Sequence, residues 1–109
     1  MANIAEQIHQ AVTKWQDVSA EPHRFGGTEY RVRHREIGHM HGNRQADLPF
    51  PVRVREQLIA EGRASPHHLL PETGWVTFYI RGEQDVPRVI DLFRLNYELI
   101  TQRQVNDNG

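Results

Sequence analysis

The sequence contains no cysteine, a single lysine and no long hydrophobic run among its 109 residues. Lack of cysteine excludes disulfides, cysteine-ligated metal sites and thiol nucleophiles. No apolar segment approaches the roughly 18 residues of a membrane-spanning helix, and the N-terminus does not resemble a secretory signal peptide. A β/α barrel needs about 250 residues and is excluded. We therefore expect one small cytoplasmic domain over residues 1–109.

Charged residues are numerous but almost balanced. Thirteen basic residues stand against 14 acidic ones, and this balance argues against a generally basic nucleic-acid binder. Twelve of the basic residues are arginine, which suits bidentate contacts with carboxylates and phosphates. Seven of these arginines lie between Arg24 and Arg55, among only three acidic residues. Surface ion pairing with the more acidic remainder is the simplest interpretation of this basic segment.

The first half of the chain predicts a helix followed by a β-hairpin. Apolar residues recur at helical spacing over residues 4–18, and Asn3 with Glu6 resembles a capping box. Residues 28–42 alternate between apolar and polar side chains, which is typical of a half-buried strand. A hairpin that turns near His34 is favoured over one long strand, because strands average five or six residues.

The second half of the chain predicts further elements of both kinds. In order, we expect an edge strand or extended segment at 48–50, a helix from Pro51 to Gly62, an irregular crossing over 64–73, a central strand over 75–80 and a helix over about 85–102. The core then spans about 4–102, and residues 103–109 form a frayed tail. The order α-β-β-α-β-α predicts a two-layer α+β domain, with helices packed on one face of a small, mainly antiparallel sheet.

The densest group of chemically capable residues is EIGHMHG, residues 36–42. His39 and His41 at i and i+2 on a strand lie about 6.5–7 Å apart on one face, close enough to share a metal. A catalytic zinc has three protein ligands, so Asp47, His67 or His68 would complete the set. A divalent metal bound by His39, His41 and His67 is therefore one hypothesis, and no other cofactor is predicted. In the alternative interpretation, the histidines only hydrogen-bond the backbone and one another.

Acid–base catalysis without a metal is a second use of the same residues. Histidine titrates near neutral pH, and a neighbouring carboxylate fixes its tautomer. Glu36 has the opposite strand parity from His39 and is not expected to reach its ring, whereas Asp47 can. The catalytic candidates are His39, His41, Asp47, His67 and His68. The sequence contains no serine-hydrolase, Walker or dinucleotide-binding motif.

Arginine and aromatic residues define a second candidate surface, on the sheet face away from the helices. Arg31 and Arg33 together with Trp75 and Tyr79 can bind an anion or a small molecule, or stack on nucleic acid. An open sheet with exposed aromatic residues is also a typical association surface, so a homodimer is expected more than a nucleic-acid complex.

The sequence resembles the luciferase-domain family of bacterial proteins, a family of unknown function, in the segments EIGHMHG, ADLPFP, RVREQLIAEGRA, PHHLLPETGWVTFYIR and DLFRLNYELI. The resemblance covers roughly residues 22–100. It implies no light emission, because flavin luciferases are full barrels and adenylating ones span several domains. The element order is more remotely similar to the MmcQ/YjbR family, and that similarity implies DNA binding through the arginine face.

The expected function is that of a small binding or accessory module, with a small enzyme and a nucleic-acid-binding module as alternatives. Its expected site is a pocket where two groups of residues meet: His39, His41 and Asp47 on one side, and His67, His68 and Trp75 on the other.

Overall fold

A computed structural model describes residues 2–23, 26–67, 69 and 73–108. Its elements are α1 (Ile4–Val12), β1 (Val18–Pro22), β2 (Thr28–Val32), β3 (Arg35–His41), β4 (Gln45–Pro49), α2 (Val52–Ala60), β5 (Ser65–Pro66), β6 (Trp75–Tyr79), the 3-10 turn η1 (Glu83–Asp85) and α3 (Val86–Asn108). The strands form one sheet in the order β1-β2-β3-β4-β6-β5, and every neighbouring pair is antiparallel. The α+β class predicted from the sequence is confirmed.

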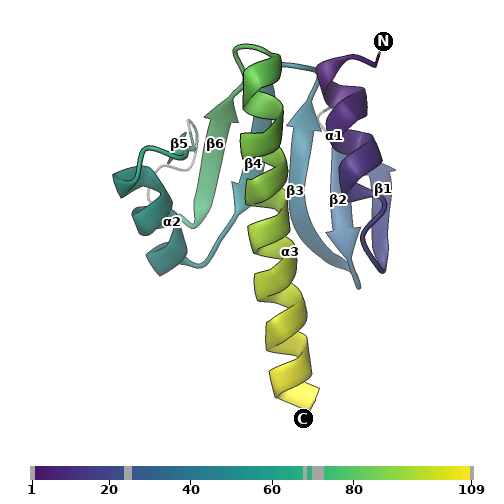
Figure 1. The fold of residues 1–109 in the computed structure, drawn as a ribbon. Coiled ribbons are helices and arrows are strands. Elements are labelled where there is room, and N and C mark those ends of the chain that lie inside the picture. The colour runs from purple at the N-terminus through teal and green to yellow at the C-terminus, as the bar shows by residue number, and fades with distance from the viewer. Residues whose placement is uncertain (1, 24–25, 68, 70–72, 109) are drawn as a thin grey trace.

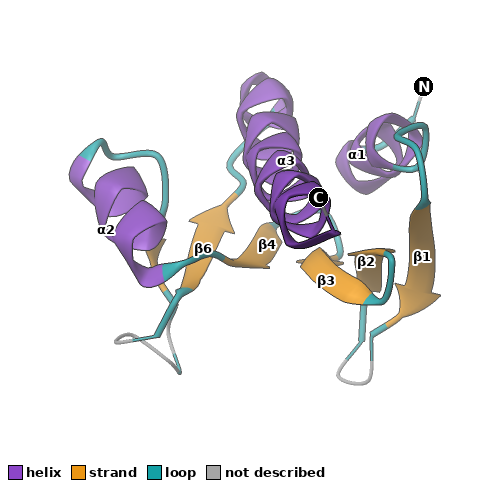
Figure 2. Cartoon of the chain, turned by 90° about the horizontal axis from the view of Figure 1, so that it is seen from below, coloured by secondary structure: helices purple, strands orange, loops and turns teal. Residues whose placement is uncertain are grey.

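The helices lie on one side of the sheet. The long helix α3 crosses the middle of the sheet, and α1 packs beside it over the β1–β2 end (Figure 1). Figure 2 shows this layering from below, with the helices on one side of the strands. The core fills the space between the layers, and Ile8 of α1, Val76 of β6 and Phe93 of α3 are fully buried there. In the described part of the chain, the opposite face of the sheet carries no helix.

Local sequence signals account for several of these elements. The Asn3 side chain accepts a hydrogen bond from the backbone N–H of Glu6, which confirms the predicted cap of α1. Arg33 and His34 both have positive φ, as the two central residues of a tight hairpin turn require, so the β2–β3 hairpin is also confirmed. The helix after Pro51 ends at Ala60, just before Gly62 with φ +74°.

The N-terminal region differs from the prediction. Helix α1 ends at Val12 instead of continuing to residue 18, and Val18 begins an edge strand, β1. Val18, Ala20 and Pro22 alternate with two polar residues in β1, but alanine, proline and glutamate are poor strand formers and most of the strand is exposed, so its sequence signal is weak.

The later strands also differ from the prediction. β4 is an interior strand and not an edge segment, because Pro49 is its last residue and leaves the remaining ladder bonds intact. β6 is an interior strand, as predicted, because it pairs with β4 on one side and with β5 on the other, but it lies next to the two-residue edge strand and not at the middle of the sheet. Helix α3 continues to Asn108, through residues predicted to be a frayed tail.

Candidate functional site

The strand register places a row of polar residues across the free face of the sheet. Each member pairs directly with the next: the row consists of Glu29 in β2, His39 in β3, Asp47 in β4, Thr77 in β6 and Ser65 in β5. Side chains that pair directly on one face lie about 4.5–5.5 Å apart at Cβ, so neighbours in this row can contact each other. The fold therefore assembles a polar cluster from five strands.

Asp47 lies at the centre of this cluster, and its side chain is only 1% exposed. Its Oδ1 accepts a hydrogen bond from the Thr77 hydroxyl at 2.7 Å, and the Gln45 side-chain amide donates to both Oδ1 and Oδ2, each at 3.2 Å. Buried carboxylates need such partners to remain charged. These bonds also fix the orientation of the carboxylate, with Oδ2 directed at the histidines.

Three imidazoles converge on this second oxygen. The Nε2 atoms of His39 and His41 lie 3.2 and 3.1 Å from Asp47 Oδ2, and Nε2 of His67 lies 3.8 Å from it. His39 and His41 come from one strand, whereas His67 follows β5 on the far side of β4. Four of the residues that the sequence analysis selected are therefore brought together.

Glu36 contacts His39, contrary to the parity prediction. The β2–β3 register shifts between Tyr30 and Arg31, so Ile37 is an extra residue in β3. Such a bulge reverses the alternation locally and places Glu36 on the same face as His39. Nδ1 of His39 donates a hydrogen bond of 2.7 Å to Glu36 Oε2. The carboxylate that the sequence analysis set aside is thus the second partner of this ring.

Packing around Gly38 and Asn96 holds the bulge in place. A Cβ atom at Gly38 would lie 2.8 Å from Leu48 Cγ, so a glycine is needed where β3 approaches β4. The fully buried Asn96 of α3 donates 2.8 Å hydrogen bonds to the carbonyls of Ile37 and Pro49. A glycine inside a strand is a known bulge signal, and Gly38 was therefore an available clue to the position of Glu36.

His23 belongs to the cluster although the sequence analysis did not select it. Its ring stacks on His39 with a centroid distance of 3.9 Å, and its Nε2 lies 3.9 Å from Glu29 Oε1. Burial and the nearby His39 lower the pKa of His23, so the ring is neutral at pH 7. His23 directly follows β1, and the weak pattern of that strand concealed its position.

The cluster shifts the pKa values of its central pair in opposite directions. Burial alone would lower the pKa of His39, but hydrogen bonds with Asp47 and Glu36 outweigh burial and raise this pKa to about 9. Burial would raise the pKa of Asp47, but its bonds with His39, Thr77 and Gln45 hold it well below its usual range. At neutral pH the metal-free site therefore contains an imidazolium between two carboxylates.

The aromatic residues of β6 are placed as the sequence predicts, on the same face as the histidines. The ring of Trp75 lies 5.5 Å from that of His39 and 5.9 Å from that of His67, so it forms one wall of the cluster. Tyr79 is 47% exposed at the end of the same strand. His68, another candidate, lies outside the described residues.

The candidate arginines have acidic neighbours. Arg31 hydrogen-bonds Glu29 and lies 3.6 Å from Glu21, while Arg33 in the hairpin turn lies 3.3 Å from Asp17. These contacts agree with the interpretation of the basic segment as an ion-pairing surface.

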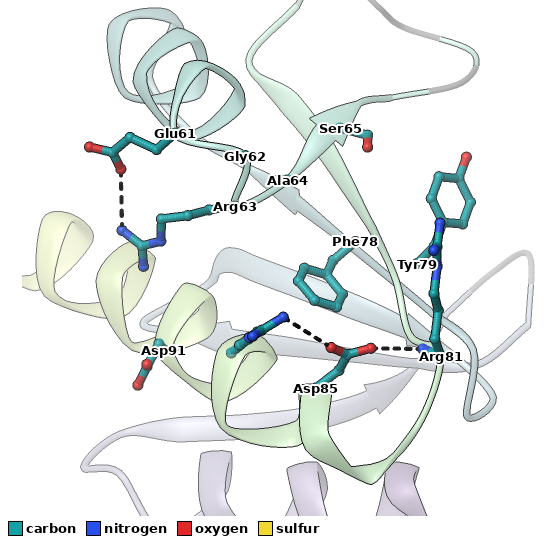
Figure 3. A pocket seen from close by; sticks show the side chains of 11 residues that line it. Glu61, Gly62, Arg63, Ala64, Ser65, Phe78, Tyr79, Arg81, Asp85 and Asp91 are labelled. Carbon is teal, nitrogen blue, oxygen red and sulfur yellow. Dashed lines mark hydrogen bonds and ion pairs between the residues drawn. The ribbon is translucent and has the colours of Figure 1, made fainter.

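A separate cavity of about 760 Å³ lies between the end of α2, strand β6 and the start of α3 (Figure 3). Several of its charged residues contact one another. Asp85 accepts a hydrogen bond from the backbone of Arg81 and lies 3.6 Å from Arg88, and Glu61 lies 3.8 Å from Arg63. The described lining contains no histidine, so this cavity is chemically distinct from the His–Asp cluster.

His39, His41 and Asp47 could together hold a metal ion. One ligand atom from each of these residues lies within 4.8 Å of the other two. Two imidazoles and one carboxylate are a common ligand set for zinc and other first-row divalent metals. Glu36 supplies the carboxylate that usually orients a metal-binding histidine from behind.

The family model for the luciferase domain matches residues 34–96, which is more than half of the chain. The chain belongs to the luciferase-domain family. The matched segment includes the bulge, the central His–Asp cluster and Asn96, but not His23. Comparisons with curated proteins and with solved structures find no match for this luciferase domain.

Within the described chain, no helix has the length and apolar character of a membrane span.

Proposed function

We propose that this luciferase domain is a small binding module that holds a divalent metal ion of the zinc class through His39 Nε2, His41 Nε2 and Asp47 Oδ2. The observation that carries the proposal is the approach of both nitrogens to one carboxylate oxygen, at 3.2 and 3.1 Å. In a tetrahedral site with metal–ligand bonds of about 2.0–2.2 Å, neighbouring ligand atoms lie roughly 3.3–3.5 Å apart. Only a small outward shift of the rings is therefore needed to admit an ion.

The groups behind the three ligands support the proposal. Glu36 accepts the Nδ1 proton of His39, which directs Nε2 of that ring towards Asp47. The Thr77 hydroxyl binds Asp47 Oδ1 while Oδ2 faces the histidines, and this arrangement favours Oδ2 as the metal ligand. In the metal-free protein a proton on His39 Nε2 takes the place of the ion, so metal binding displaces that proton.

Three protein ligands are the number found at catalytic zinc sites, whereas structural sites have four. The fourth position is then available to water or a small ligand. The His41 side chain is 32% exposed, in contrast to the buried His39 and Asp47, so access from solvent is on the His41 side. This arrangement supports an ion that a small molecule can reach.

Acid–base catalysis is the second candidate function, and one observation favours it. His39 is bonded through both ring nitrogens to carboxylates, and its pKa of about 9 makes it a proton donor at neutral pH. This function needs no ion, so a metal-binding experiment separates it from the first.

Thermal unfolding after treatment with a chelator tests the proposal. Zinc or nickel at 100 times its dissociation constant adds about 2.7 kcal/mol of stability, which corresponds to a rise in Tm of roughly 10 °C or more for a domain of this size. The double variant His39→Ala/His41→Ala should show no rise. His34→Asn is the matched control, because it removes an exposed histidine at a positive φ that asparagine tolerates. An equal rise in the double variant would mean that the ion binds elsewhere.

A further inference from the structure

His67 approaches Asp47 from the side opposite to His39 and His41. It directly follows β5, which pairs with β6, whereas the other two histidines lie in β3 on the other side of β4. Nε2 of His67 lies 3.8 Å from Asp47 Oδ2. An ion bound to that oxygen and to the β3 histidines would therefore have His67 beside it, on a different element.

The hydrogen bonding of His67 determines which ring nitrogen carries the proton. The backbone N–H of Leu69 donates a 3.1 Å hydrogen bond to Nδ1, so the lone pair of Nδ1 is used. A neutral imidazole then carries its proton on Nε2. A protonated nitrogen is not a metal ligand, so His67 Nε2 is not expected to bind the ion. In His39 the arrangement is reversed: Nδ1 donates its proton to Glu36, and Nε2 is left for the metal. His67 therefore presents an N–H donor to the cluster.

The surroundings strengthen the effect of that donor. The His67 side chain is only 10% exposed, and the ring of Trp75 contacts both His67 and His39. A hydrogen bond in such a partly dry environment is stronger than one in bulk water. Rotation of the ring is also limited, because the bond from Leu69 would be lost.

Charge selects the kind of ligand. A divalent ion bound by two neutral imidazoles and one carboxylate leaves one positive charge in its coordination shell. The negative charge of Glu36 balances it only from the far side of His39, at the ring nitrogen turned away from Asp47. A residual positive charge next to an N–H donor favours an anion over a neutral molecule. Anionic oxygen ligands suit zinc-class ions and accept hydrogen bonds from imidazole.

We propose that the open position of the metal site takes an anionic oxygen ligand, such as a carboxylate, and that His67 Nε2–H donates a hydrogen bond to it. This inference rests on the proposed metal binding at His39, His41 and Asp47, and it adds a ligand class and a residue that selects it.

Cobalt(II)-loaded protein and acetate provide the test, because the visible spectrum of cobalt reports both metal binding and a change of its ligands. Acetate should change the spectrum of the wild type in a saturable way. His67→Phe keeps an aromatic ring but has no donor, and it should weaken acetate binding at least tenfold while cobalt affinity changes less than threefold. His67→Gln retains an N–H donor and should stay within threefold of the wild type for acetate.

The outcomes distinguish this inference from the metal proposal. If the wild type fails to bind cobalt, both are wrong. If cobalt binds but acetate affinity is unchanged in His67→Phe, or falls equally in both variants, only the inference about His67 is overturned. Nitrogen-15 NMR of the wild-type imidazoles gives a test that needs no variant: a proton on Nε2 of His67 supports the inference, and a neutral ring protonated on Nδ1 contradicts it.

Discussion

Two carboxylates face the two nitrogens of one imidazole at the centre of this domain. Glu36 lies at Nδ1 of His39 and Asp47 lies at Nε2. Burial alone would make this ring neutral, so its charge depends on both carboxylates. The same arrangement can hold a proton or, on the Asp47 side, a metal ion. The occupant of this position decides between acid–base chemistry and metal binding.

The stability of the metal-free protein should therefore fall as the pH rises from 7 to 9.5. The folded pKa of His39 is about 9, above the unfolded value near 6.5, so its stabilisation is complete below about pH 6.5 and is lost as the pH passes through 9. Urea unfolding in the presence of a chelator should show a loss of about 2 kcal/mol over this range. His39→Gln should give a much flatter profile, and an equally flat profile for the wild type would contradict the assignment.

Only part of the site could be predicted at the scale of single residues. The i, i+2 spacing of His39 and His41 requires a shared face in any regular strand, and this geometry needs no tertiary information. Glu36 was missed because one extra residue in β3 reverses its parity. His23 was missed because its position depends on β1, an exposed edge strand with little apolar pattern.

At the scale of elements, Asn96 connects the helical layer to the site. Its buried side chain, 1% exposed, binds the carbonyl of Ile37 at the bulge and that of Pro49 at the end of β4. These two strands carry His39 and Asp47. One helix side chain therefore fixes the local geometry of both strands that supply the candidate ligands.

Asn96→Ala should destabilise the protein by about 2–4 kcal/mol, because it leaves two buried carbonyls without their donor. Urea unfolding measures this loss. Gln102→Ala is the matched control on the exposed side of the same helix and should stay within about 0.5 kcal/mol of the wild type. A similarly small loss for Asn96→Ala would show that the bulge does not depend on this contact.

The elements that the sequence predicted well have strong local signals. The cap at Asn3, the β2–β3 turn and the alternation of β6 were all recognisable from neighbouring residues. The interior position of β4 was not, because proline preference argues against a central strand unless the proline ends it. Strand order in the sheet depends on long-range pairing, which local patterns do not encode.

At the scale of the whole molecule, the two faces of the sheet have different uses. The helices lie on one face (Figure 2), and the register places the polar row with its histidines on the other. The sequence predicted this division from strand parity. It did not predict six strands, because β1 and β5 are short or exposed and carry little apolar pattern.

Association through the free face remains a prediction. Tyr79 is 47% exposed there, and exposed aromatic residues on an open sheet favour self-association. Light scattering should give about twice the 12.7 kDa mass of one chain, and Tyr79→Arg should lower it towards a single chain. A single-chain mass for the wild type at high concentration would contradict the dimer without affecting the metal proposal.

X-ray absorption at the zinc edge, on protein loaded with one equivalent of zinc, tests the central claim most directly. Binding at the His–Asp cluster predicts two imidazole nitrogens, one carboxylate oxygen and a fourth light ligand, all at about 2.0–2.2 Å. The imidazole signal should disappear in His39→Ala/His41→Ala. A wild-type spectrum with oxygen ligands only, or with a single imidazole, would contradict the proposed site.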